Sequence, residues 1–200
     1  MIHRRQLLAA GAGLVVMTPL KIPLTFITGA IGSAAASPDV LAESGLAGSL
    51  ELISAARENA RAARVSDIDS TILIGQLSKA WARHPRPLFG MTRSDVAVLV
   101  EALARDHGMA VVYRGWHDHR ADGSVHHVLH GDAKAVAMLK RQFNSTGSFG
   151  KILGEQITVL TASGGRPESV NFEVATGRQP SGRARFVSWA VAPVETATAI

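Results

Sequence analysis

Apolar residues in the first half of the chain recur every three or four positions, the spacing that gathers them on one face of an α-helix. This spacing predicts three helices, which begin near residue 48, after Ser66 or Asp67, and after Thr92 or Ser94. The segment HPRPLFG ends the second of them, because its prolines cannot continue the helical hydrogen-bond ladder. The first half is therefore expected to be mainly helical.

The second half contains strand-like patterns. MAVVYRGWH and SVHHVLH are rich in β-branched and aromatic residues and flank the turn dipeptide Asp122-Gly123, which predicts a β-hairpin. Asp132 stands where a fourth helix needs a cap. Alternating polarity after residue 151 predicts three antiparallel strands: ILGEQITVLTA, SVNFEVATG and RARFVSWAVAP. The expected fold is α+β, with N-terminal helices, a β-hairpin, a further helix and a C-terminal antiparallel β-meander.

Composition limits the classes of function. The chain has 200 residues and 46% hydrophobic content, enough for one domain with a core. It has no cysteine, which excludes disulfides, thiolate metal sites and a thiol nucleophile. The net charge of +5 falls to +2 beyond residue 36, where 18 basic residues face 16 acidic ones. Because the basic residues are scattered and aromatic residues are only 5% of the chain, nucleic acid is not an expected partner.

The first 36 residues have the layout of an export signal, with a short basic region, an apolar stretch and a small-residue end. The pair Arg4-Arg5 is followed by one polar residue and two leucines. This pattern resembles the core of the twin-arginine signal family. The resemblance implies that the twin-arginine export machinery carries the folded protein to a periplasmic or secreted location. Residues 37–200 would then be a single α+β domain, attached to the membrane only if the leader were not cleaved.

Histidines are concentrated in the predicted hairpin, which holds five of the eight in the chain: His117, His119, His126, His127 and His130. A two-residue turn at Asp122-Gly123 would put four of them on one face: His117, His119, His126 and His130. A three-residue loop shifts the register by one and puts His127 in place of His126. The opposite face, with Val112, Trp116, Val125 and Leu129, is expected to be the buried one.

Three imidazoles on one face suit a divalent transition ion such as zinc or copper, and a fourth, open position would match a catalytic zinc. Asp118 or Asp122 is placed to add an oxygen ligand or to orient a ring. The alternative is that these histidines form the solvated face of a half-exposed hairpin and bind only water.

No paired carboxylates, nucleophile motif or phosphate-binding glycine loop is recognisable in the sequence. This favours a non-catalytic accessory or partner-binding domain, which travels with a larger exported subunit or assembles onto it. The alternative function is a histidine-ligated transition-metal protein, or a small metal-dependent hydrolase, that uses the hairpin from His117 to His130. The sequence assigns no catalytic residue.

Overall fold

A seven-stranded mixed sheet organises the part of the chain that the computed structural model describes, residues 37–145, 148–162, 166–175 and 185–194. The strand order is β2-β1-β3-β7-β4-β5-β6. The strands are β1 (Asp39–Glu43), β2 (Ala62–Ser66), β3 (Leu88–Thr92), β4 (Met109–His119), β5 (Ser124–Asp132), β6 (Pro167–Ala175) and β7 (Arg185–Pro193). The helices are α1 (Ser49–Ala56), α2 (Ser70–Trp81), α3 (Ser94–Asp106), α4 (Ala133–Phe143), α5 (Phe149–Glu155) and α6 (Ile157–Leu160).

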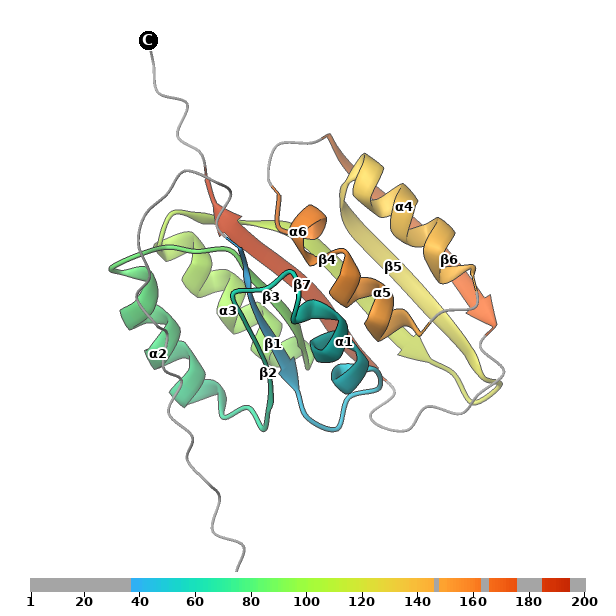
Figure 1. Ribbon diagram of the computed structural model, residues 1–200, viewed down its shortest axis with the longest axis horizontal. Helices are drawn as coiled ribbons and strands as arrows, with labels where there is room; N and C mark the ends of the chain where they lie inside the picture. Colours follow the sequence, from blue (N-terminus) through green and yellow to red (C-terminus); the bar gives the residue numbers. More distant parts are fainter. Residues whose placement is uncertain (1–36, 146–147, 163–165, 176–184, 195–200) are drawn as a thin grey trace, which may run out of the picture.

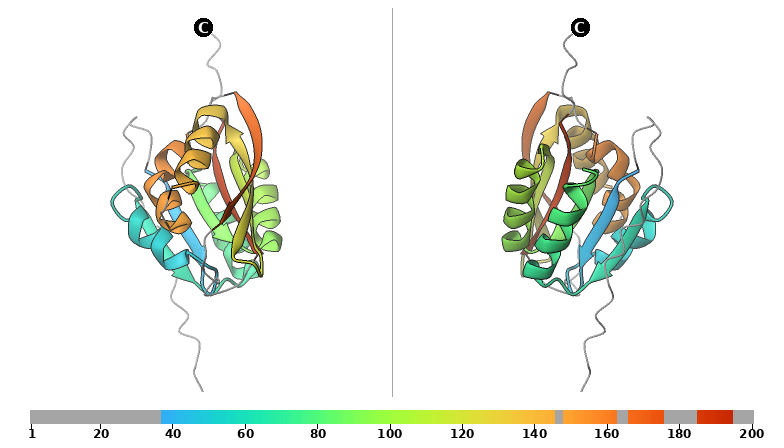
Figure 2. Two further views of the ribbon diagram at one scale, coloured as in Figure 1. Left: turned by 90° about the vertical axis from the view of Figure 1, so that its right-hand side faces the viewer. Right: turned by 90° about the vertical axis from the view of Figure 1, so that its left-hand side faces the viewer.

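Helices lie on both faces of this sheet (Figure 1 and Figure 2). On one face, α1, α4, α5 and α6 cover the larger core, and on the other α2 and α3 cover a smaller one. Figure 1 shows α2 and α3 behind the half of the sheet formed by β1, β3 and β7, to one side of β5 and β6. No described helix therefore covers β5 and β6 on that face.

The N-terminal half of the sheet is parallel, because β1 pairs in parallel with both β2 and β3. Strands β1 and β3 are buried along their whole length, as strands covered on both faces are. The prediction of a helix from residue 48 was right for α1 but missed β1 and β2 on either side of it. The segment HPRPLFG also contains the start of β3, which the sequence analysis missed.

The predicted C-terminal meander is wrong. The stretch ILGEQITVLTA forms α5 and α6, and its buried residues Leu153, Ile157 and Leu160 are spaced by four and three positions, as on one helix face. The two later strands form but do not pair with each other. Strand β6 pairs with β5 at the edge, whereas β7 pairs with β3 and β4 in the middle.

The α+β class is confirmed, as are the helices α2, α3 and α4 and the hairpin of β4 and β5. Helix α2 begins at Ser70, and its cap is Asp69, which accepts hydrogen bonds from the first turn, rather than Ser66 or Asp67 as expected. Asp132 caps α4 as predicted. None of the described helices is both long and apolar enough to cross a membrane. The leader, with Arg4 and Arg5, lies outside the described residues.

Candidate functional site: a buried histidine pair and an open sheet face

The hairpin of β4 and β5 has a three-residue loop. His117 pairs with His127, and His119 pairs with Val125, so three residues remain between Arg120 and Ser124. Gly123 has a φ of 81°, the left-handed conformation that such loops require before the second strand. The three-residue alternative is therefore confirmed, and the two-residue turn is wrong.

This register sends the histidines to two different faces. His117, His119 and His127 point toward α4 and α5, whereas His126 and His130 point away. The inward face also carries Val125 and Leu129, so the expectation that these two lie opposite the histidines is wrong. The expectation that Trp116 is buried with them is also wrong, because it lies on the outward face and is 41% exposed. The solvated-face hypothesis is wrong for His117 and His127, which are each 2% exposed. Because the loop has three residues, His117 and His127 lie on the same face of the hairpin as Val125 and Leu129, and this face packs against the core.

The two buried histidines lie in one row across four strands: Phe186 on β7, His117 on β4, His127 on β5 and Phe172 on β6. Their rings are 5.0 Å (His117–Phe186) and 5.2 Å (His127–Phe172) from their neighbours, measured between centroids. Phe143 of α4 and Phe149 of α5 cover the row, at 4.8 Å from His127 and 5.4 Å from His117. The imidazoles are thus enclosed by phenylalanines from four elements.

Hydrogen bonds join the pair to two hydroxyl groups. The Nδ1 atoms of His117 and His127 are 2.8 Å apart, and Nε2 of His117 is 2.7 Å from Oγ of Ser188. The Tyr113 hydroxyl is 3.1 Å from the same Oγ. Gly115 makes room for this chain, because a Cβ atom there would lie within 3 Å of the Tyr113, Ser188 and His117 polar atoms. The result is a continuous, buried chain of four polar side chains.

Burial makes the neutral form of these groups the stable one. It lowers the pKa of His127 to about 3, and it lowers the pKa of His117 well below the ordinary value, with nearby histidines adding to both effects. Burial also lowers the pKa of His119, although Asp118 partly offsets this. The pKa of Tyr113 is raised by burial. Both rings of the pair are therefore neutral at pH 7, and the N–H of one ring can donate to the bare nitrogen of the other.

The described residues hold no group of three histidine, aspartate or glutamate side chains arranged to bind a metal ion. Two nitrogens on one tetrahedral zinc lie about 3.3 Å apart, given Zn–N distances of about 2.0–2.1 Å. The His117–His127 distance of 2.8 Å is that of a direct hydrogen bond instead. His119 lies on the same face with its Nε2 buried and unpartnered among the described residues. The zinc or copper site at these histidines stays a prediction.

Ser188, His117 and His127 also have the spacing of a nucleophile, a base and an orienting group. Ser188 has no exposed surface, however, so no substrate reaches its hydroxyl in this conformation. The arrangement can hold a proton between two neutral rings, but it offers no access for catalysis.

A second candidate site lies on the opposite side of the same strands. We call it the open face, defined by these outward side chains of β4, β5 and β6: Trp116, Asp118, His126, Val128, His130, Asn171 and Glu173. Register places them in rows, with Arg185, Asp118, His126 and Glu173 in one and Val187, Trp116, Val128 and Asn171 in the next. Together with Arg185 and Val187 of the neighbouring β7, the open face thus presents one charged row beside one largely apolar row.

The polar groups of the open face are paired within the chain. Nε of Arg185 donates to Asp118 at 2.8 Å, Arg120 donates to Glu173 at 2.7 Å, and the His126 and Asn171 side chains are 2.6 Å apart. The face therefore needs no charged partner to satisfy it.

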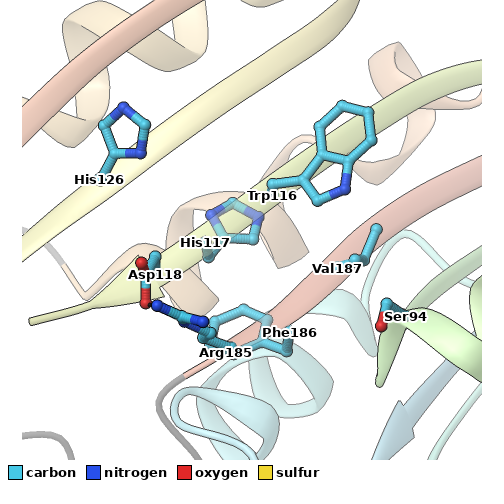
Figure 3. Close-up of a pocket in the computed structure, with 8 residues that line it drawn as sticks. All are labelled: Ser94, Trp116, His117, Asp118, His126, Arg185, Phe186 and Val187. Atoms are coloured by element: carbon cyan, nitrogen blue, oxygen red, sulfur yellow. Dashed lines mark hydrogen bonds and ion pairs between the residues drawn. The ribbon is translucent and has the colours of Figure 1, made fainter.

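A hollow of about 210 Å³ opens where this face meets the first turn of α3, and its lining includes Ser94, Trp116, Val187 and Arg185. Figure 3 shows Arg185 and Asp118 turned toward each other, with Trp116 and Val187 on neighbouring strands. Trp116 is 41% exposed, and the Arg114 guanidinium stands 5.2 Å from its ring centroid. Arg114 is in turn held by a two-point ion pair with the buried Glu101 of α3. The Trp116 ring is thus exposed but held in place.

Comparison with protein-family models, with curated proteins and with solved structures finds no match to this chain. Only the geometry of the two candidate sites therefore supports a function for this chain.

Sequence reasoning missed Ser188, Tyr113 and the phenylalanines around the pair. One signal was present, since Ser188 is the only polar residue within the apolar run FVSWAVA of the last strand. A lone hydroxyl in a buried strand calls for a hydrogen-bond partner, which His117 supplies.

Proposed function

We propose that residues 37–200 form an exported accessory domain that binds a larger exported subunit through the open face. The observation that carries this proposal is a pair of strands, β5 and β6, that no described helix covers on this face, beside an exposed tryptophan of β4 in a preformed hollow. Tryptophan and arginine are the residues most enriched among those that dominate binding energy at protein interfaces. Here Trp116 and Arg114 stand together.

The chemistry of the face limits the partner. Asp118 and Glu173 already have arginine partners, so a charged partner group would have to break an existing ion pair. The hollow beside Trp116 and Val187 suits one aliphatic or aromatic side chain instead. We therefore expect a neutral protein segment that inserts an apolar side chain beside Trp116.

Export is the second part of the proposal. The Arg4-Arg5 pair in the leader supports passage through the twin-arginine machinery, which carries folded proteins. A periplasmic or secreted domain of this kind would meet its partner before or after transport.

A photo-crosslinking amino acid at His130, at the edge of the open face, tests this function. We expect one discrete exported protein to be crosslinked in the native host, and we expect Trp116→Ala to reduce the yield at least tenfold. Leu50→Ala is the matched control, because Leu50 is exposed by 74% but lies on α1, in the other layer. Crosslinks that survive Trp116→Ala, or a chain that is crosslinked only to itself, would contradict the proposal.

A further inference from the structure

The contact between His117 and His127 depends on how many protons the two rings carry. With both rings neutral, one Nδ1 donates to the other across 2.8 Å. An added proton on the accepting nitrogen leaves two N–H groups facing each other, and it also places a positive charge in the core. A proton on the outer nitrogen of the donating ring keeps the hydrogen bond but places the same charge in the core, and protonation of both rings is incompatible with the hydrogen bond.

The surroundings supply no negative charge to compensate. Strand β7 presents Phe186 and Ser188 to the pair, β6 presents Phe172, α4 presents Phe143, and α5 presents Phe149. None of these side chains is charged. The ionisable groups nearest on β4 and β5 are other histidines, His119 and His126, and both disfavour a charge on the pair.

None of the carboxylates of the packed elements pairs with the two histidines: Asp132 caps α4, Glu168 of β6 is exposed, and the other three pair with basic residues. Asp118 of β4 faces outward to Arg185, Glu173 of β6 to Arg120, and Glu155 of α5 to Lys151. Helix α4 carries no acid at all; its ionisable residues are Lys134, Lys140 and Arg141. Lys140 extends over the Phe172 ring, with its Nζ 5.9 Å from the ring centroid. A protonated, positively charged histidine pair would thus lie beneath a helix whose side-chain charges are also positive.

Helix α4 is the part of the cover that can leave. Helix α5 is fixed to α1 by close backbone contact: a Cβ atom at Gly150 would lie 2.2 Å from the Gly48 carbonyl oxygen, and one at Gly154 2.5 Å from that of Leu52. Helix α4 instead lies over β5 and β6 at the edge of the sheet (Figure 1). Phe143, at its C-terminal end, contacts both imidazole rings.

We propose that the His117–His127 pair is an acid-sensitive switch: protonation separates the two rings and detaches α4 from β5 and β6. Detachment exposes the phenylalanines around the pair. This inference is independent of the proposed partner, since it concerns the opposite face of the sheet.

The direction of the effect follows from proton linkage. The closed form holds the pKa of His127 at about 3 and that of His117 well below the ordinary value, whereas a solvated histidine has a pKa near 6.5. Above about pH 6.5 neither form takes up a proton and closure does not depend on pH. Below it, the open form binds more protons, and the opening equilibrium constant rises up to about tenfold per pH unit for each histidine.

Hydrogen exchange of the full chain from about pH 7.5 to about pH 4.5, corrected for intrinsic rates, tests this switch. We expect amides of α4 to lose protection progressively below about pH 6.5, while amides of α2 and α3 keep theirs. His127→Phe keeps an aromatic ring against Phe143 and Phe172 but takes no proton. It should reduce the pH dependence of α4 exchange by up to about tenfold per pH unit, the contribution of one histidine. His130→Gln, at an exposed position of the same strand, should leave it unchanged.

Three results would overturn the switch: α4 protection that does not change with pH, loss of protection by all elements at one pH, or a His127→Phe variant with the wild-type pH dependence. If that variant fails to fold, nitrogen chemical shifts of the wild-type imidazoles decide. We expect His117 and His127 to stay neutral as long as α4 is protected. Ordinary titration near pH 6.5 with α4 still protected would refute the switch.

Discussion

At the scale of single residues, the buried polar chain depends on an absent side chain. Gly115 sits where the Tyr113 hydroxyl, the Ser188 hydroxyl and Nε2 of His117 converge, and each would lie 2.6–2.9 Å from a Cβ atom at that position. None of the three can move without breaking a hydrogen bond of the chain. The glycine thus permits the hydrogen-bonded arrangement.

Gly115→Ala is therefore expected to lower the free energy of unfolding by about 1–3 kcal/mol, the usual cost of overpacking a core. Gly75→Ala is the matched control, because nothing lies within 4 Å of a Cβ atom there and the position is inside α2. That change should raise stability by about 0.5–1 kcal/mol through helix propensity. Urea unfolding measures both, and a Gly115→Ala variant as stable as the wild type would contradict the packing described.

The His117–His127 hydrogen bond also makes a prediction about metal. If the two rings bond to each other, protein purified without a histidine tag should carry less than about a tenth of an equivalent of zinc or copper. Elemental analysis beside a His117→Ala/His119→Ala double variant measures this. Stoichiometric metal in the wild type that disappears in the variant would establish the metal site and rule out the direct hydrogen bond.

At the scale of elements, α4 is held at its start by one side chain. Asp132 accepts hydrogen bonds from the backbone N–H groups of Lys134 and Ala135, both at 3.0 Å. These are two of the donors that a helix leaves unpaired at its N-terminus. The cap connects the end of β5 directly to α4.

Asp132→Ala should cost about 1 kcal/mol of unfolding free energy, whereas Asp132→Asn, which keeps an accepting oxygen, should cost much less. Thermal unfolding of the two variants at one pH separates the effects. Equal losses would mean that the cap contributes nothing and that only the charge of Asp132 matters.

The sequence predicted those elements whose signal is local. Asp132, the Asp122-Gly123 turn and the apolar periodicity of α3 each sit beside the structure that they specify. Strands β1 and β3 lacked such a signal, because a strand buried on both faces shows no alternation. The spacing of the apolar residues in α5 and α6 is compatible with both a helix and a strand, because the segment is short. Their packing against α1 in one core selects the helix.

The candidate site was predicted only in part, for a related reason. Sequence alone brought the histidines together, but one residue of loop length decided which of them face the core. The partners Ser188 and Phe186 come from a strand about seventy positions further along the chain than His117. No local pattern links them to His117.

At the scale of the whole molecule, we expect the leader to direct export and the folded domain to bind the partner. Changing Arg4 and Arg5 together to lysine should leave the protein in the cytoplasm, because the resemblance to twin-arginine signals lies in that pair. Cell fractionation and immunoblotting measure the distribution. Lys21→Arg, in the same leader but outside the pair, should export normally. Undisturbed export of the double lysine variant would remove the twin-arginine assignment.

The position of β7 has a consequence for synthesis. It is the last of the described strands in chain order, yet it alone joins the parallel group β2-β1-β3 to the antiparallel group β4-β5-β6. Its residues Trp189 and Val191 belong to one core, and Phe186 and Ala190 belong to the other. A ribosome-bound chain that ends before Arg185 has two half-sheets and nothing to connect them. The complete sheet therefore cannot form until β7 has left the ribosome, which leaves a period in which chaperones can bind the unfolded chain.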